Sequence, residues 1–181
     1  MGMVSVAMGY SFHEAPSSND NARAALWSSA RGAGGQMILG FLGLVTAALF
    51  AGAAFYVNFA EQPARLALND RAALVQWQRS YERAAVMQAS LAMLGFALGL
   101  AAWWWEGRDL RWLVGALVLL APWPYTLLVI KPVNDKLKAA DPIGAGAQTR
   151  ALIERWGRLH AGRTVLGVLA TAIFFCAAMA R

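Results

Sequence analysis

Four long apolar stretches constrain the fold of this chain more than any motif does. They run over residues 34–60, 84–105, 112–130 and 164–179. Crossing a hydrocarbon core of about 30 Å takes roughly 20 residues of apolar helix. The fourth stretch is the shortest, and we expect its helix to begin earlier, near Thr149, as an amphipathic segment. The sequence therefore predicts a multi-pass integral membrane protein with four spanning helices.

The composition and the connections between the stretches favour one compact architecture. Hydrophobic residues make up 59% of the 181 residues and charged residues only 14%, far from the balance of a soluble domain. Two long connections and one very short one predict an all-α transmembrane four-helix bundle over residues 34–181. Residues 1–33 include His13 and lack the continuous apolar region of a signal peptide. We predict that they form a flexible N-terminal tail.

Lysine and arginine are distributed unevenly between the two sides of the predicted bundle. The two long connections hold 11 of them, and the other side holds five. The positive-inside rule then places both long connections in the cytoplasm and both termini outside, in what we expect to be a bacterial inner (plasma) membrane. The net charge of +6 fits contact with membrane lipids. No nucleic-acid partner is expected, because no basic patch accompanies a recognition element.

Cysteine and histidine are too few for several kinds of membrane redox protein. Cys176 is the single cysteine, so the chain lacks the CxxC pair of a thiol oxidoreductase. His13 and His160 are the two histidines, which argues against a bis-histidine haem within one chain. No cluster has the spacing of metal ligands. We therefore expect neither a metal site nor a cofactor.

Small and aromatic residues indicate packing and membrane anchoring. Gly95 and Gly99 form a GxxxG motif, which serves helix contact either within one bundle or between two copies of the chain. The tryptophans at 103–105 and Trp112 surround the short connection. This arrangement is typical of an aromatic belt at a membrane interface.

Polar and aromatic groups gather at the opposite end of the predicted bundle. The first and third spans run in the same direction, and each ends in an apolar run followed by a proline with amides and charges nearby. Helical spacing puts Trp156, His160 and Arg163 on one face at the start of the fourth span, and Trp77 and Tyr81 on one face before the second. We predict one pocket here, with Tyr56, Asn58, Glu61, Trp77, Tyr81, Asn134, Trp156, His160 and Arg163 as its residues.

His160 has the chemistry of a proton acceptor near neutral pH. The residues around His160 also allow an interpretation as membrane anchors without a chemical role. Arg155, Arg158 and Arg163 would reach lipid phosphates, and Trp156 would anchor the interface.

Four segments along the chain carry a family resemblance. They are FAGAAFYVNFAEQPARL, YERAAVMQASLA, LLVIKPVNDKL and LIERWGRLHAGRTVLGVLA, which together extend over about residues 36–178. With KPVN and the Trp-x3-His-x2-Arg arrangement as its closest marks, the sequence resembles the DUF1772 family of small four-helix integral membrane proteins, which includes the anthrone oxygenases. One departure is Gln62-Pro63, where His-Pro is a common mark of the family. It removes a possible second base or ligand.

The resemblance implies cofactor-independent oxygenation of a phenolic tricyclic substrate such as an anthrone. In that scheme His160 is the base, Arg163 and Asn134 are oxyanion donors, and Tyr56, Trp77 and Trp156 form the walls. A competing hypothesis is a non-catalytic membrane protein, either a binder of a lipid or quinone-like molecule or an accessory subunit of a membrane complex. The partners expected are membrane lipids, an apolar aromatic small molecule, and a second copy of the chain or another membrane subunit.

Overall fold

The computed structural model describes residues 18–105 and 107–180, and the regular structure of these residues is helical. The chain divides into two compact units, Met1–Gly35 and Gln36–Arg181, and the second contains the functional site described below. The elements in chain order are α1 (Ser18–Tyr56), the π-helical turn η1 (Val57–Glu61), α2 (Gln62–Leu66), α3 (Asp70–Trp105), α4 (Leu110–Leu120), α5 (Pro122–Tyr125), the π-helical turn η2 (Thr126–Ile130), α6 (Lys131–Ala139), the 3₁₀ turn η3 (Pro142–Gly144) and α7 (Ala147–Met179).

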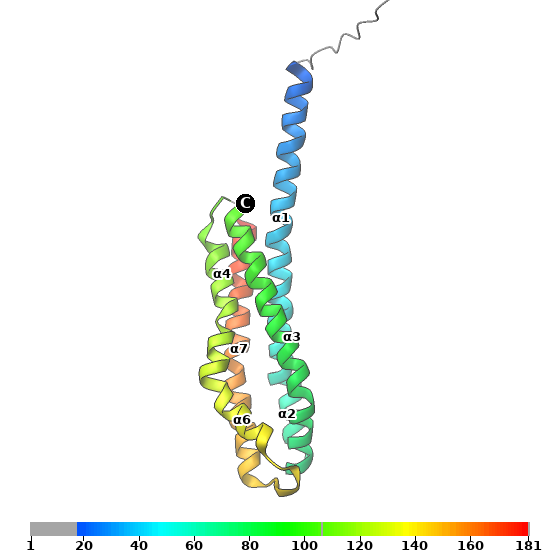
Figure 1. Ribbon diagram of the computed structural model, residues 1–181, viewed down its shortest axis with the longest axis vertical. Coiled ribbons are helices and arrows are strands. Elements are labelled where there is room, and N and C mark those ends of the chain that lie inside the picture. Colours follow the sequence, from blue (N-terminus) through cyan, green and yellow to red (C-terminus); the bar gives the residue numbers. More distant parts are fainter. Residues whose placement is uncertain (1–17, 106, 181) are drawn as a thin grey trace, which may run out of the picture. The chain divides into compact units, whose positions relative to one another are not determined.

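Among the described residues, four helical rods are long and apolar enough to cross a membrane. They are Ile38–Leu66, Asp70–Trp105, Leu110–Ala139 and Ala147–Met179. In Figure 1 the third and fourth rods lie together, and α3 crosses obliquely from the α2 end of the bundle to meet α4. The prediction of an all-α chain with four helices long and apolar enough to span a membrane is confirmed. The last helix begins at Ala147, close to the start expected near Thr149.

The segment predicted to be a flexible tail lies partly outside the described residues. Residues 1–17, with His13 among them, are not described. The helix α1 begins at Ser18, so the rest of the predicted tail, up to residue 33, is helical. The flexibility of this segment stays a prediction.

Two π-helical turns interrupt the first and third rods, each just before a proline. The turn η1 ends at Glu61, two residues before Pro63, and η2 ends at Ile130, two residues before Pro132. Proline has no N–H to donate, and its ring clashes with the carbonyl four residues earlier in a regular α-helix. A wider turn relieves both problems locally. The helix therefore continues past each proline, and α2 and α6 carry Arg65 and Asn134 to the site.

Close contact between helices at the α4 end depends on glycine. A Cβ atom at Gly99 would lie 2.5 Å from a ring atom of Phe174, and one at Gly95 would lie 3.3 Å from Thr46 of α1. Both glycines of the predicted motif thus pack inside the bundle. Trp112, which we expected in an interfacial belt, is buried in the same core, whereas Trp104 is more than half exposed. The belt prediction is wrong for Trp112 because its ring packs against Phe174.

Arginine side chains fasten the turns at both ends of the bundle. Arg150 of α7 donates to the Asp70 carboxylate at 2.5 Å and to the Leu66 carbonyl at 2.8 Å, which ties α7 to the connection between α2 and α3. At the other end, Asp109 accepts the backbone N–H of Arg111 at the start of α4. Hydrogen bonds from the Arg111 side chain lower the pKa of the Asp109 carboxyl.

Candidate functional site

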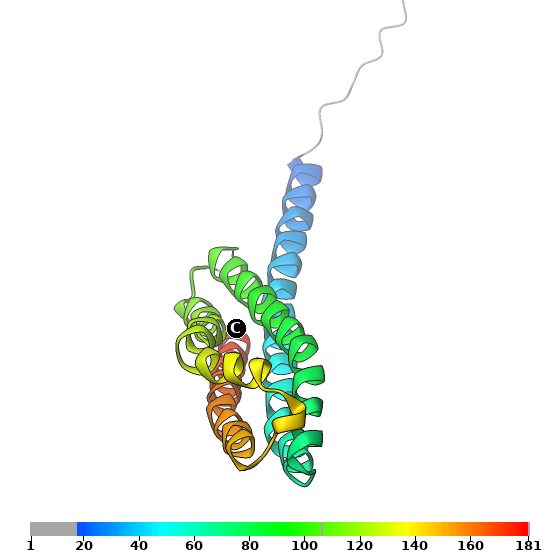
Figure 2. The same cartoon turned by 60° about the horizontal axis from the view of Figure 1, so that its bottom comes forward.

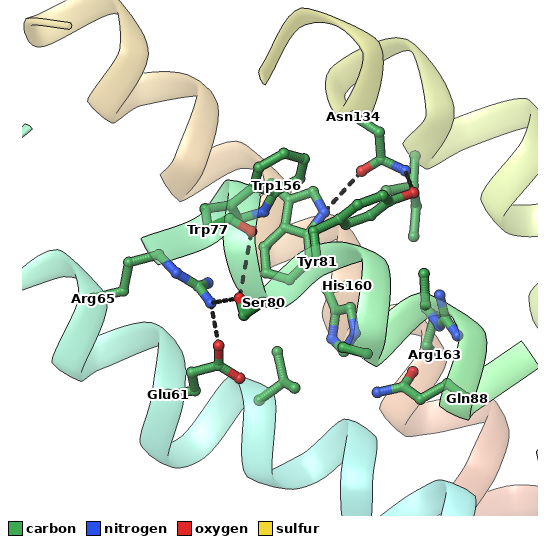
Figure 3. Close-up of a pocket in the computed structure, with 14 residues that line it drawn as sticks. Glu61, Arg65, Trp77, Ser80, Tyr81, Gln88, Asn134, Trp156, His160 and Arg163 are labelled. Atoms are coloured by element: carbon green, nitrogen blue, oxygen red, sulfur yellow. Dashed lines mark hydrogen bonds and ion pairs between the residues drawn. The ribbon is translucent and has the colours of Figure 1, made fainter. Parts of the chain in front are cut away.

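A small cavity lies where α3, α6 and the first half of α7 meet the end of the first rod (Figure 3). Its volume is about 20 Å³, which is room for about one water molecule. The lining residues are Val57, Glu61, Arg65, Trp77, Ser80, Tyr81, Ala84, Ala85, Gln88, Ile130, Asn134, Trp156, His160 and Arg163.

Aromatic rings form one wall of this cavity. Trp77 stacks on Tyr81 with ring centroids 4.7 Å apart, and Trp156 meets Trp77 edge-on at 5.8 Å. The His160 ring lies 4.9 Å from Trp156. Trp77 and Trp156 are both buried, and they belong to one apolar cluster with the residues around them. Trp156 is therefore part of the buried site and does not anchor the interface.

Hydrogen bonds fix which nitrogen of His160 carries the proton. The Asn58 amide nitrogen donates to the Gly157 carbonyl at 2.8 Å, so the Asn58 amide oxygen faces α7 as an acceptor. That oxygen lies 2.9 Å from His160 Nδ1 and also accepts the Thr164 hydroxyl at 3.0 Å. Nδ1 of the neutral ring must then bear the hydrogen, which leaves a lone pair on Nε2. Nε2 has no hydrogen-bond partner in the described part of the chain.

Asn134 connects two of the aromatic residues. Its amide oxygen accepts the indole N–H of Trp156, and its amide nitrogen donates to the Tyr81 hydroxyl oxygen, both at 2.9 Å. The Tyr81 oxygen is thus an acceptor toward Asn134, and the phenolic hydrogen remains to be donated elsewhere. Among the described residues nothing accepts it. Asn134 therefore positions Tyr81 and Trp156, and Tyr81 keeps a free donor at the cavity.

Arg65 is a buried cation whose charge is compensated. Its side chain is 2% exposed, and it donates to Glu61 and to Gln62, both at 2.5 Å, and to the Gln76 amide oxygen. The guanidinium also lies over the Trp156 ring, 5.3 Å from its centroid. Glu61 is thus engaged as the counter-ion of Arg65, which explains how a charge is tolerated at this depth.

Arg163 differs from Arg65 in its partners, and its guanidinium lies over the Phe50 ring, 5.7 Å from the ring centroid. Its Nη1 reaches the Thr126 hydroxyl at 3.5 Å, at the limit of a hydrogen bond, and its buried Nε has no partner. None of the ion pairs found in residues 18–105 and 107–180 involves Arg163. Nearby, the buried Gln88 amide has neither its oxygen nor its nitrogen bonded. Figure 3 shows Gln88, His160 and Arg163 around the same part of the cavity.

Unpaired polar groups of this kind are costly unless a bound molecule satisfies them. The site therefore offers a proton acceptor, a cation without a counter-ion and a phenolic donor within one buried space.

The structure brings most of the predicted site residues together. Glu61, Trp77, Tyr81, Asn134, Trp156, His160 and Arg163 line the cavity. Asn58 lies behind His160 and holds it. Tyr56 is 61% exposed and does not line the cavity. Residues two apart on a helix point about 200° away from each other, so Tyr56 and Asn58 cannot face the same way.

Sequence reasoning missed three polar residues of the cavity, namely Arg65, Ser80 and Gln88. For Gln88 a signal exists. It follows Tyr81 by seven residues and Ala85 by three, which is the spacing of one helix face, and it is an amide inside an apolar stretch. Arg65 follows Glu61 by four residues, the spacing of a helical ion pair. In residues 18–105 and 107–180, no three His, Cys, Asp or Glu side chains are grouped to hold a metal ion.

Comparison with known proteins gives one match. Residues 77–173 match the anthrone oxygenase family, and no curated protein or solved structure matches the chain. The matched region extends from the first turns of α3 into the last third of α7, so it contains Trp77, Tyr81, Asn134, His160 and Arg163. More than half of the chain lies within the match. The protein therefore belongs to the anthrone oxygenase family, also known as DUF1772.

Proposed function

We propose that this protein is an oxygenase that converts a phenolic, anthrone-like substrate to a quinone without a cofactor. The observation that carries the proposal is the arrangement of His160, whose Nδ1 is held by Asn58 and whose Nε2 is an unpartnered acceptor at the cavity. Family membership supports the same reaction class. A neutral imidazole in this state is suited to act as a general base.

The reaction balances with substrate and dioxygen alone. His160 Nε2 accepts a proton from the acidic CH₂ group beside the two aromatic rings, and the resulting carbanion carbon bonds to dioxygen as a peroxide. The second C–H hydrogen then leaves as a proton, its electron pair forms the C=O bond, and the O–O bond breaks. The outer oxygen takes up that proton and is released as hydroxide, which leaves a ketone. The hydroxide takes back the proton from His160 and departs as water. The substrate supplies all four electrons, so no reductant is needed.

Arg163 and Tyr81 are suited to stabilise the oxyanion of the deprotonated substrate. Arg163 is a cation with a buried, unpartnered N–H, and Tyr81 has a hydroxyl hydrogen to donate. Donors fixed in advance at a developing negative charge often supply the largest part of a rate enhancement. We assign the second oxyanion donor to Tyr81 and not to Asn134, because the Asn134 oxygen and one of its two N–H groups are already bonded, whereas the single hydroxyl hydrogen of Tyr81 is free.

The test is turnover by the purified full-length chain in lipid nanodiscs, with anthrone as substrate. Dioxygen consumption and anthraquinone formation are followed together, and isotopically labelled dioxygen reports the source of the new oxygen. We expect His160→Ala to lower turnover by about 100-fold or more, the usual minimum for loss of a general base. Arg158→Ala, an exposed residue on the same helix, is the matched control and should leave turnover unchanged.

Two results would overturn the proposal. One is wild-type turnover no faster than spontaneous oxidation in protein-free nanodiscs. The other is full turnover by a folded His160→Ala variant. Binding of the substrate without turnover would instead favour the non-catalytic alternative, in which Arg163 and Tyr81 hold an aromatic ligand and His160 has no chemical role.

A further inference from the structure

A second and larger cavity adjoins the first. Its volume is about 140 Å³, and it lies between α3 and the segment formed by α5 and η2. Tyr81, Ala85 and Arg163 line both cavities, so they form the boundary between them. We call this larger space the α3–η2 groove.

The sequence explains why a groove opens at this level of the bundle. On the α4 side, Gly95 and Gly99 allow α3 to pack closely. At the level of α5 and η2, the α3 lining of the groove includes the alanines Ala85, Ala89 and Ala92, whose side chains are too short to fill the space. Figures 1 and 2 both show α3 inclined to the third rod, with the two closest at α4 and further apart below it.

The groove opens toward the hydrocarbon of the membrane. Trp123 and Leu127 form its outer edge and are 41% and 56% exposed. Both lie in the apolar part of a candidate span, between Leu110 and the lysine at position 131. Exposed apolar side chains at this position contact lipid chains, so a molecule dissolved in the bilayer can reach the groove without crossing water.

The inner end of the groove is polar. The Arg163 guanidinium lies there with its unpartnered Nε and its long contact to Thr126, together with Tyr81. A groove with apolar walls, a lipid-facing mouth and, at its inner end, a cation that belongs to none of the ion pairs in the described residues matches an amphiphilic ligand whose oxygen enters first.

We propose that the α3–η2 groove admits a planar phenolic or quinone-type aromatic molecule directly from the bilayer, with one ring inserted and its oxygen at Arg163 and Tyr81. The volume supports a single inserted ring, because a protein cavity of about 150 Å³ binds benzene. The remaining rings lie at the mouth, against Trp123 and Leu127. The ligand class rests on the proposed function, but the route and the orientation rest on the groove itself.

The test is equilibrium binding of dihydroxyanthraquinone to the full-length protein in phosphatidylcholine nanodiscs. Ala89→Trp fills the groove and should weaken binding by about tenfold or more, which corresponds to the loss of one buried ring. Ala97→Trp is the matched control, since Ala97 is an exposed residue of the same helix and lies outside both cavities. Ala89→Leu fills less of the groove and should have an intermediate effect if the tryptophan variant fails to fold.

A second comparison tests the orientation. Arg163→Met should weaken binding of dihydroxyanthraquinone but not of anthracene, which has the same three rings and no oxygen. Unchanged binding of dihydroxyanthraquinone to folded Ala89→Trp or Ala89→Leu would refute binding in the groove. Equal losses of affinity for dihydroxyanthraquinone and anthracene in Arg163→Met would refute the proposed orientation. Loss of binding in these variants, with no turnover by the wild type, would support the groove and refute the proposed oxygenase. Turnover by the wild type, with binding unchanged in the groove variants, would support the proposed oxygenase and refute the groove.

Discussion

Replacing Asn58 by leucine tests the assignment of the His160 proton. Leucine has a similar size but no amide, so the variant removes the acceptor of His160 Nδ1 and of the Thr164 hydroxyl. Thr164 can turn to a carbonyl of its own helix. The Gly157 carbonyl keeps its place in the helix ladder. The buried Nδ1–H of His160 is therefore the main group left unpaired.

A buried donor left without a partner costs about 1–3 kcal/mol. We expect Asn58→Leu to lower the free energy of unfolding by about 2 kcal/mol, which lowers the midpoint of thermal unfolding by roughly 4–8 °C for a chain of this size. Turnover should fall by about tenfold or more, because the ring is no longer held with Nε2 as the acceptor. Thr164→Val is the control. It removes one hydrogen bond to the same oxygen but leaves the contact between Asn58 and His160.

Nitrogen NMR of histidine-labelled protein measures the proton position directly. The chain has two histidines, so the substitution His13→Gln leaves the His160 signals alone in the spectrum. In the wild type, the unprotonated nitrogen should be Nε2, and in Asn58→Leu both tautomers should be populated. An unprotonated Nδ1 in the wild type would refute the reasoning, whatever the turnover of the variants.

Three further predictions concern stability and topology. Glu61→Gln should lower the free energy of unfolding by about 3 kcal/mol by leaving Arg65 without its counter-ion, and adding Arg65→Met should recover most of the loss in thermal unfolding. Gly157→Ala should destabilise by about 1–3 kcal/mol because its Cβ would lie 2.6 Å from the amide nitrogen of the buried Gln62, whereas Gly52→Ala, with nothing within 4 Å, should stabilise by about 0.5–1 kcal/mol in the same measurement. Reporter fusions should place both long connections in the cytoplasm, and a cytoplasmic signal from a reporter at the C-terminus would contradict this.

The fold follows from the sequence because the membrane imposes a strict rule on it. An apolar stretch of about 20 residues in lipid must satisfy its backbone within itself, and the helix is the simplest structure that does so. The positions of Gly95 and Gly99 then indicate where helices approach closely. What the apolar pattern does not indicate is the length of each helix beyond the membrane. The first rod continues to Leu66 and the third to Ala139, through prolines that suggest an end or a kink.

Site residues were harder to predict, because distance from the membrane boundary says nothing about direction around the helix. Tyr56 and Asn58 lie at the same depth, but a rotation of about 200° separates them, and only Asn58 faces α7. The π turns add a further difficulty. Each one inserts an extra residue into a turn, so positions after η1 and η2 are shifted relative to a regular helix. Contacts such as that between Asn134 and Tyr81 depend on this shift and on packing between distant segments.

The clearest sequence signal for the site is an arginine that has no acidic partner at helical spacing. The residue type alone is a weaker signal. Arg65 and Arg163 lie at the same end of the bundle, and each guanidinium has several N–H groups to donate. Arg65 has an acidic residue four positions earlier, and the two form an ion pair in the structure. Arg163 has leucine, histidine or glycine at the four positions where a helical partner would lie, three and four residues to either side. A cation that the helix does not neutralise must be exposed, paired across the bundle or reserved for a ligand. Across the bundle, Arg163 reaches the Thr126 hydroxyl and the Phe50 ring, which are both uncharged, and its Nε is buried and unpartnered, so a ligand is the option that accounts for it.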